Sequence, residues 1–268
     1  MTQSPEALPD RLRDVEHLEE VMTTPSAALI AALQELPGDI IILGVGGKIG
    51  PTLARLAKRA TPGKRVVGVA RFSEKGVREK LAGHGIECIE ADLLERKQID
   101  ALPKLANVVF MAGRKFGSSG QEDLTWAMNA HVPALVAEAF AGSRIVAYST
   151  GCVYPFVNVH HGGATEATPA TPPPGVYANS CVAREAMFQY FSRTRGTPGR
   201  IIRLNYAIDS ATACCTTSPR ACSPARRSIS PPATSTSSGK ATPMPWCCAP
   251  SAIARCLRAR STSADRRR

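Results

Sequence analysis

Residues 39–60 read DIIILGVGGKIGPTLARLAKRA, in which an apolar run, a glycine-rich turn and a segment with helical spacing follow one another. The run 39–43 is typical of a strand that is buried on both faces. The segment 51–60 predicts a helix, which tolerates Pro51 in its first turn. A strand, a tight turn and a helix in this order predict the βα unit of a nucleotide-binding fold.

The turn spaces its glycines as G-x-x-G-x-x-G, at Gly44, Gly47 and Gly50. Glycine lets the backbone turn tightly and approach a pyrophosphate, and the N-terminus of the next helix offers unpaired N–H groups and a favourable dipole. Together with Lys48 and Ile49, these glycines are the first candidate cofactor-binding residues. The alternative is a merely tight βα turn, but the flanking strand and helix favour a dinucleotide site.

The alternation of strands and helices continues to about residue 208. Further strands are predicted at 65–70, 86–91, 107–113 and 144–150, and further helices at 74–85, 97–105 and 124–140. This order predicts an α/β, Rossmann-like, doubly wound parallel sheet with helices on both faces over residues 37–208. Residues 1–36 are predicted to be a helical extension, with Thr24 as the N-cap of its helix over 26–36.

The end of the second predicted strand bears on the choice of cofactor. An acidic residue there would bind the ribose 2′-hydroxyl of NAD, but the chain has Ala70 followed by Arg71, with Lys75 nearby. A guanidinium suits the 2′-phosphate of NADP, so Arg71 is a candidate cofactor residue and the sequence favours NADP over NAD. If Arg71 merely caps a strand at the surface, NAD stays open.

Several further motifs resemble the extended short-chain dehydrogenase/reductase family, the NAD-dependent epimerase/dehydratases, over residues 39–208. They are Asp92-Leu93 after the third strand, Ala112-Gly113 after the fourth, Asn129 in the following helix, the segment STGCVY at 149–154, Glu166 in a loop and Arg203-Leu204-Asn205. The resemblance implies that Asp92 and Leu93 contact the adenine, and that Ala112 and Gly113 lie under the cofactor.

The resemblance also implies the catalytic residues, which are Thr150, Tyr177 and Asn129. In the family a tyrosine is the general acid/base, a Ser/Thr hydroxyl polarises the reacting oxygen, and hydride moves to or from the nicotinamide. Counting back from Val153-Tyr154 assigns the hydroxyl to Thr150, which Ser149 could assist.

One departure from the family concerns the lysine of its Tyr-x-x-x-Lys pattern, where this chain has Tyr177-Ala-Asn-Ser-Cys181. Without that ammonium the phenolate of Tyr177 is scarce at neutral pH. Arg114 and Lys115, after the fourth strand, could supply a cation or hold an anionic substrate, or they are ordinary solvated charges. Arg184 is a weaker substitute by its distance in sequence, and the oxidised nicotinamide is itself a cation.

These residues predict an NAD(P)-dependent oxidoreductase, epimerase or dehydratase that acts on a carbohydrate-like small molecule, a sugar or sugar acid. The alternative is a non-catalytic NAD(P)-binding sensor or an inactive member, which Cys181 favours. Family members often dimerise through helices near Asn129 and Tyr177, so a homodimer is expected. The cysteine spacing indicates no metal site.

The C-terminal part, residues 209–268, differs in composition from the rest. Residues 210–268 carry +9 of the net charge of +11, they are dominated by Ala, Pro, Ser, Thr, Arg and Cys, and their composition predicts a disordered basic tail. When the tail is back-translated and its codons are regrouped by one base, the new reading gives segments that resemble strands and a helix. We therefore favour a one-base change of reading frame near Asp209, either natural or an error of sequencing. The tail would then replace the substrate-binding region of the family. Because the body is nearly neutral, neither nucleic acid nor a membrane is an expected partner, and without a signal segment a cytoplasmic location is expected.

Overall fold

The computed structural model describes residue 9 and residues 11–115, 120–158, 160 and 162–205. The hypotheses on residues 209–268, including the change of frame near Asp209, lie outside the described residues. Of the helices in the described part, none is both long and apolar enough to cross a membrane.

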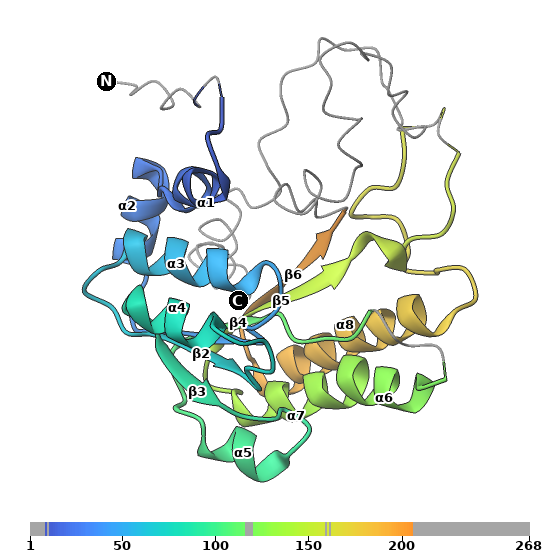
Figure 1. Ribbon diagram of the computed structural model, residues 1–268. Coiled ribbons are helices and arrows are strands. Elements are labelled where there is room, and N and C mark those ends of the chain that lie inside the picture. The colour runs from blue at the N-terminus through green and yellow to red at the C-terminus, as the bar shows by residue number, and fades with distance from the viewer. Residues whose placement is uncertain (1–8, 10, 116–119, 159, 161, 206–268) are drawn as a thin grey trace, which may run out of the picture.

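Six parallel strands form one sheet in the order β3-β2-β1-β4-β5-β6 (Figure 1). They are β1 (Ile40–Leu43), β2 (Val66–Ala70), β3 (Glu87–Glu90), β4 (Asn107–Phe110), β5 (Arg144–Thr150) and β6 (Gly199–Leu204). The chain winds outward from β1 in one direction to β3 and then returns to continue with β4, so the strand order reverses between β1 and β4. This topology confirms the predicted doubly wound, Rossmann-like α/β fold.

Helices cover both faces of the sheet (Figure 1). Beyond the glycine turn they are α3 (Gly50–Ala60), α4 (Val77–Gly83), α5 (Arg96–Ala101), α6 (Glu122–Trp126), α7 (Val132–Ala139) and α8 (Val176–Arg195). The strand β1 is buried on both faces: Ile40 and Ile42 pack with residues of α3 and α4, whereas Ile41 and Leu43 pack with those of α5, α7 and α8. A continuous apolar run therefore marks the centre of the sheet.

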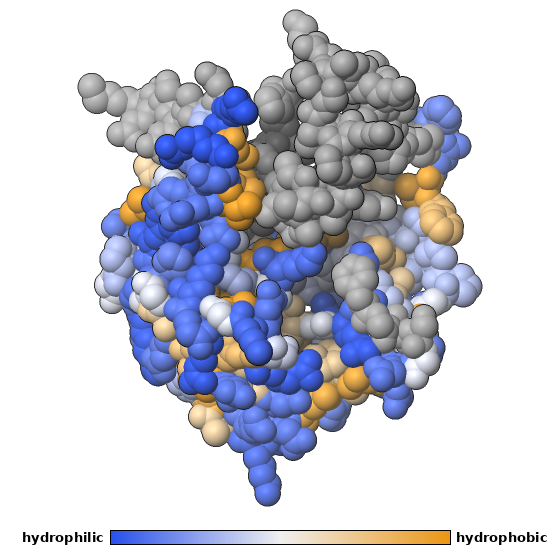
Figure 2. Space-filling view, in the orientation of Figure 1, coloured by the Kyte–Doolittle hydropathy of each residue, from blue (hydrophilic) through white to orange (hydrophobic). Residues whose placement is uncertain are grey.

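Two helices precede the sheet, α1 (Val15–Thr23) and α2 (Ala27–Glu35). The N-cap of α2 is Ser26, whose hydroxyl accepts a hydrogen bond from the N–H of Leu29, so the prediction of Thr24 as the cap was wrong by two residues. Sequence periodicity did not separate α1, which is fixed on α3 by ion pairs of Glu20 with Arg55 and Arg59. The surface over α3 and α4 is correspondingly hydrophilic (Figure 2).

Two other predicted helices differ from the structure. The helix expected over 97–105 ends at Ala101, since Pro103 cannot continue it. The helix expected over 124–140 is broken into α6 and α7 by a π-helical turn, Ala127–His131, that contains Asn129. Such wide turns are rare and are found most often at functional sites.

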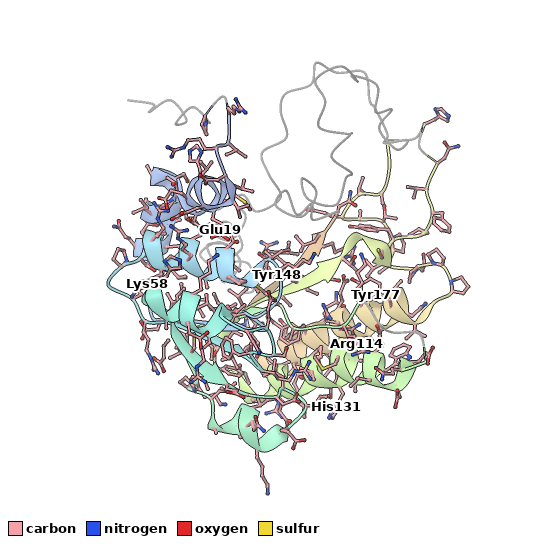
Figure 3. All side chains as sticks on the ribbon, in the orientation of Figure 1. Glu19, Lys58, Arg114, His131, Tyr148 and Tyr177 are labelled. Carbon is pink, nitrogen blue, oxygen red and sulfur yellow. The ribbon has the colours of Figure 1, made fainter. Side chains whose placement is uncertain are left out.

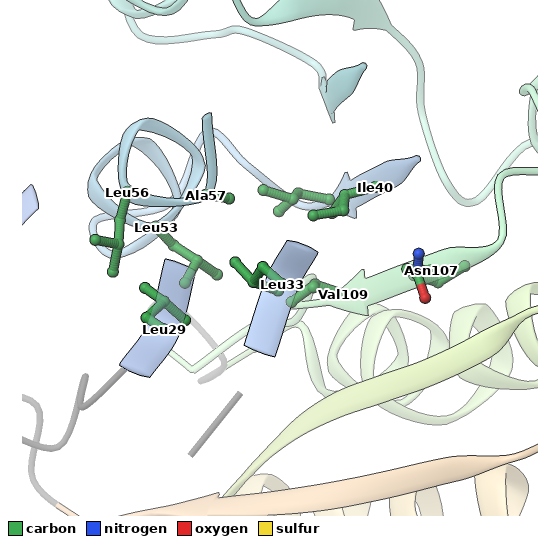
Figure 4. A pocket seen from close by; sticks show the side chains of 10 residues that line it. Leu29, Leu33, Ile40, Leu53, Leu56, Ala57, Asn107 and Val109 are labelled. Carbon is green, nitrogen blue, oxygen red and sulfur yellow. The ribbon is translucent and has the colours of Figure 1, made fainter. Parts of the chain in front are cut away.

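A small apolar cavity of about 20 Å³ lies where α2 packs on β1 and α3 (Figure 4). Leu29, Leu33 and Leu53 line it, and the amide of Asn107 at its edge donates hydrogen bonds to the carbonyl oxygens of residues 37–39. Its size and its lining make it a packing defect between the N-terminal extension and the sheet, with room for little more than one water molecule.

Candidate nucleotide-binding and active site

The glycine turn between β1 and α3 has no room for side chains at two of its positions. Gly44 has a φ of +91°, and a Cβ there would lie 2.5 Å from the backbone nitrogen of Ala112. A Cβ on Gly50 would collide with the carbonyl oxygen of Val45. The first glycine therefore permits a left-handed turn against the end of β4, and the third lets α3 begin directly against the turn.

A cavity of about 220 Å³ opens beside this turn, at the carboxyl ends of β1, β2, β3 and β4. Seven of the predicted cofactor residues line it: Gly44, Gly47, Arg71, Asp92, Leu93, Ala112 and Gly113. Lys48, Ile49 and Gly50 do not line it but form the start of α3, where Ile49 is the N-cap residue. The cavity lies at the reversal of strand order, which is where open α/β sheets bind ligands.

One lining residue was missed from the sequence. Phe72 has a φ of +46° and is, in the described part of the chain, the non-glycine residue with a positive φ. A bulky residue in this conformation is strained, and such strain gathers at binding sites. Nothing in the residue type signals it, because an aromatic residue after a strand ordinarily suggests packing.

Arg71 and Asp92 meet across the mouth of the cavity. The closest distance between the guanidinium and the carboxylate is 3.9 Å, and 63% of the Arg71 side chain is exposed. A contact at this distance between exposed groups contributes little to stability. Arg71 is thus free to turn towards an anionic group in the cavity.

Thr150 and Tyr177 come together at the other end of the site. Thr150 is the last residue of β5 and Tyr177 is in the first turn of α8, and the Thr150 hydroxyl lies close enough to the Tyr177 phenol to act on its pKa. The Thr150 hydroxyl also accepts a hydrogen bond from the N–H of Cys152, at 3.2 Å. Ser149 points elsewhere, because its hydroxyl donates to the buried carboxylate of Glu185 at 2.6 Å.

Burial raises the pKa of Tyr177 to about 12, and the neighbouring Cys181 contributes in the same direction. The Thr150 hydroxyl and the charge of Arg184 act against this rise. Burial also raises the pKa of the Cys181 thiol, against the opposite effects of Arg184 and Tyr177. At neutral pH both groups therefore rest in their protonated forms.

Asn129 is fully buried and connects the two halves of the site. Its side-chain oxygen accepts from the N–H of Arg114 at 2.8 Å and from Nη2 of Arg184 at 2.6 Å. Its nitrogen donates to the carbonyl oxygen of Arg114 and to the hydroxyl of Ser180, each at 2.9 Å. With these bonds the side chain holds the segment after β4 against α8 and does not face the cavity.

Arg114 and Lys115 follow β4, at the edge of the sheet where α8 begins with Tyr177. Figure 3 labels Arg114 and Tyr177 in this region. The ammonium of Lys115 lies 5.6 Å from the centre of the Tyr177 ring, and the guanidinium of Arg114 hydrogen-bonds Gln121. The structure thus places Lys115, of the two predicted substrate residues, against the candidate catalytic tyrosine.

The chain matches the model of one protein family. Residues 40–207 match the model of the NAD dependent epimerase/dehydratase family. The chain belongs to this family. No protein with a curated description matches it.

Several solved structures of other proteins are similar to this fold. DesIV, a dTDP-glucose 4,6-dehydratase from Streptomyces venezuelae, is 22% identical with a TM-score of 0.55, over 62% of this chain and 55% of its own. The UDP-Glc/GlcNAc 4-epimerase from Campylobacter jejuni is 20% identical with a TM-score of 0.56, over 62% and 53%. WbmH from Bordetella bronchiseptica, solved with NAD+, is 22% identical with a TM-score of 0.56, over 65% and 58%. The chain thus matches little more than half the length of these proteins.

In this member of the epimerase/dehydratase family, sequence reasoning missed a buried ion pair near the candidate site. Glu185 on α8 is 3% exposed and accepts hydrogen bonds from Ser149 and from the Arg203 guanidinium at 2.7 Å. Arg203 also lies over the ring of Tyr154, at 4.7 Å, and these contacts raise its pKa. The pair ties α8 to the ends of β5 and β6. Charged residues on the buried side of a helix were the available signal.

In the described part of the chain no cluster of three potential metal ligands occurs.

Proposed function

We propose that the protein binds NAD(P) in the 220 Å³ cavity and acts as an oxidoreductase, epimerase or dehydratase on a carbohydrate-like substrate held beside Thr150 and Tyr177. The observation that carries this is the meeting of Thr150, at the end of β5, with Tyr177, at the start of α8, on the sheet edge that also forms the cavity. The similar structures of a sugar-nucleotide dehydratase and a sugar-nucleotide epimerase support a sugar or sugar acid as the substrate.

The cavity fits a dinucleotide by its shape and its donors. Gly44 and Gly47 bring bare backbone to its wall, α3 begins beside it, and Asp92 and Leu93 form its far side. These groups would hold the pyrophosphate and the adenine, respectively. When bound, the nicotinamide exchanges a hydride with a carbon of the substrate.

The preferred cofactor is NADP. Arg71 lines the cavity directly after β2, where Ala70 provides no carboxylate to bind a ribose hydroxyl. Its weak contact with Asp92 leaves the guanidinium available to a 2′-phosphate. The similar structures that were solved with NAD hold that cofactor in their own sites, so the preference is a proposal about this chain.

The chain's own residues handle the proton and the reacting oxygen. The Thr150 hydroxyl hydrogen-bonds the substrate oxygen, and Tyr177 exchanges a proton with it. Because the pKa of Tyr177 is about 12, its phenol is ready to donate a proton to a carbonyl oxygen at neutral pH. Lys115, beside the Tyr177 ring, is placed to attract an anionic group of the substrate.

The test of this proposal has two steps. Fluorescence titration with NADPH and NADH measures binding. Turnover is then followed with a panel of nucleotide-activated sugars and sugar acids, by reduction of added NADP or NAD where the substrate is oxidised and by product analysis where epimerisation or dehydration leaves the cofactor unchanged. We expect binding of both cofactors, tighter for NADPH, and turnover with at least one compound. Absence of binding to either cofactor would overturn the proposal.

A second candidate function is a non-catalytic NAD(P) sensor. The buried, protonated thiol of Cys181 favours it, since the position offers no cation to Tyr177. Cofactor binding without turnover by any compound of the panel would favour this function over the enzyme.

We also propose that the protein is a homodimer through α6 and α8. Trp126 on α6 and Tyr190 on α8 are 41% and 49% exposed, which is unusual for side chains of this size. Light scattering on the purified protein tests this, and a monomer at micromolar concentration would refute it.

A further inference from the structure

Arg184 has a position that its distance in sequence from Tyr177 did not suggest. It lies two turns further along α8, its side chain is buried, and its Nη1 donates to the carbonyl oxygen of Tyr148 at 3.0 Å. Its Nη2 donates to Asn129, and a Cβ on Gly113 would collide with this nitrogen. The guanidinium therefore lies directly beneath the ends of β4 and β5, at the border of the cavity.

No carboxylate neutralises this charge within the part of the chain that the structure describes. The adjacent Glu185 is bound to Arg203 and Ser149, and Arg184 forms no ion pair with it or with any other described acid. The ring of Phe110, 5.7 Å away, gives the guanidinium a weaker aromatic contact. Burying a charge without an opposite charge is unfavourable, so its presence indicates a role beyond stability.

The groups that face Arg184 and Tyr177 come from three elements. From α8 they are Cys181 and Glu185, from the end of β5 and the following turn they are Thr150 and Cys152, and from the segment after β4 there is Lys115. The charge of Arg184 favours the ionised forms of Tyr177 and Cys181, against the effect of their burial.

Position 181 lies between Tyr177 and Arg184 along the same buried side of α8, and its side chain is fully buried. A lysine there would bring an ammonium close to the guanidinium, because residue 181 already interacts electrostatically with Arg184. Two buried like charges repel each other strongly, so the site has room for one cation.

We propose that Arg184 is the single buried cation of this site and acts as a positioning residue. It fixes the segment after β4 through Asn129 and the end of β5 through Tyr148, and its charge acts on Tyr177 in place of a cation at position 181. Its effect on turnover rests on the proposed function, whereas the presence of one cation does not.

A double-mutant cycle tests the single cation without any substrate. The variants are Arg184→Met, Cys181→Lys and their combination, with Cys181→Met as the control for size at that position. We expect Cys181→Lys to lower the Tm below that of Cys181→Met by at least about 4 °C in the parent, and much less in the Arg184→Met background. Equal losses in the two backgrounds would overturn the proposal. If Arg184→Met does not fold, the comparison of Cys181→Lys with Cys181→Met in the parent decides, and equal Tm values overturn the proposal.

Measurement of kcat tests whether the charge of Arg184 acts on Tyr177. Arg184→Met is expected to lower kcat by about tenfold or more while the Kd of NADPH changes by less than about twofold, because a weaker acid is a poorer proton donor. Arg184→Lys should retain more activity than Arg184→Met, and the combined Cys181→Lys/Arg184→Met variant should recover part of the loss. The matched control is Arg193→Met, which removes an exposed arginine from the same helix. If Arg184→Met and Arg193→Met lower kcat equally, the role of Arg184 is refuted. If the parent itself shows no turnover, the proposed function fails and the Tm cycle alone decides whether the site holds one cation.

Discussion

The two halves of the site depend on different parts of the chain, one on the backbone and the other on side chains. Around β1, β2 and β3 the site depends on backbone geometry, because no side chain fits at Gly44 and Gly50 of the glycine turn, and we call this the backbone half. Around β4, β5 and α8 the site is a network of side chains, in which Asn129 and Arg184 hold the segments together. The backbone half follows the family pattern, whereas the side-chain half departs from it at Cys181. Under the proposed function, the half that binds the cofactor keeps the family pattern while the groups that move protons are rearranged.

The strongest test of this contrast is Tyr177→Phe, which should affect one half alone. We expect kcat to fall by about 10³-fold, because loss of a general acid removes about 10² to 10⁴ in rate, while the Kd of NADPH stays within about twofold. Tyr190→Phe, an exposed tyrosine on the same helix, is the matched control. Parent-like turnover of Tyr177→Phe would show that this tyrosine is not the proton donor.

Gly44→Ala should break the other half. The residue has a φ of +91° and a new Cβ would meet the backbone of Ala112, so we expect a loss of stability of about 3 kcal/mol and at least about tenfold weaker cofactor binding. Chemical unfolding and fluorescence titration measure the two effects. Gly63→Ala is the control, because its Cβ would meet no atom within 4 Å. Equal behaviour of the two variants would contradict the close approach of Gly44 to β4.

How far the sequence predicts this molecule follows the same division. The strands were found because β1, β4 and β5 are runs of apolar residues, and such runs depend on local composition. The glycine turn was found because its requirement is local as well. The helix α1 was missed because ion pairs with α3, distant in sequence, fix it there.

In the side-chain half, sequence spacing was a poor guide. The spacing to Tyr177 made Arg184 the weaker substitute for the absent lysine, yet the guanidinium reaches Asn129 and the end of β5 from two turns along α8. Glu185 was missed altogether, since its partners Ser149 and Arg203 lie on two other elements. Contacts among three elements depend on how the helix is rotated on the sheet, and one sequence does not specify that rotation.

A smaller effect is expected for Arg71→Gln, which tests the cofactor choice within the backbone half. Removing the guanidinium should weaken NADPH binding by about tenfold and leave NADH binding within about twofold, because only NADPH carries the 2′-phosphate. The ratio of the two Kd values is the measurement, and Arg78→Gln, an exposed arginine of α4, is the control. Equal weakening of both cofactors would mean that Arg71 does not read the 2′ position.

The smallest expected effect is on the pH dependence of kcat/KM, which should be almost flat, and it tests the side-chain half. As a proton donor, Tyr177 is active below its pKa, which burial raises to about 12. The kcat/KM for reduction of a carbonyl substrate by NADPH should therefore vary by less than about twofold between pH 7 and pH 9, apart from any ionisation of the substrate. If a nearby cation had lowered the pKa of Tyr177 to about 7, kcat/KM would instead fall by about tenfold for each pH unit above it. If kcat/KM falls in this way and no ionisation of the substrate explains the fall, Arg184 and Lys115 lower the pKa of Tyr177 more than burial raises it. The side-chain half would then supply the full effect of the missing lysine.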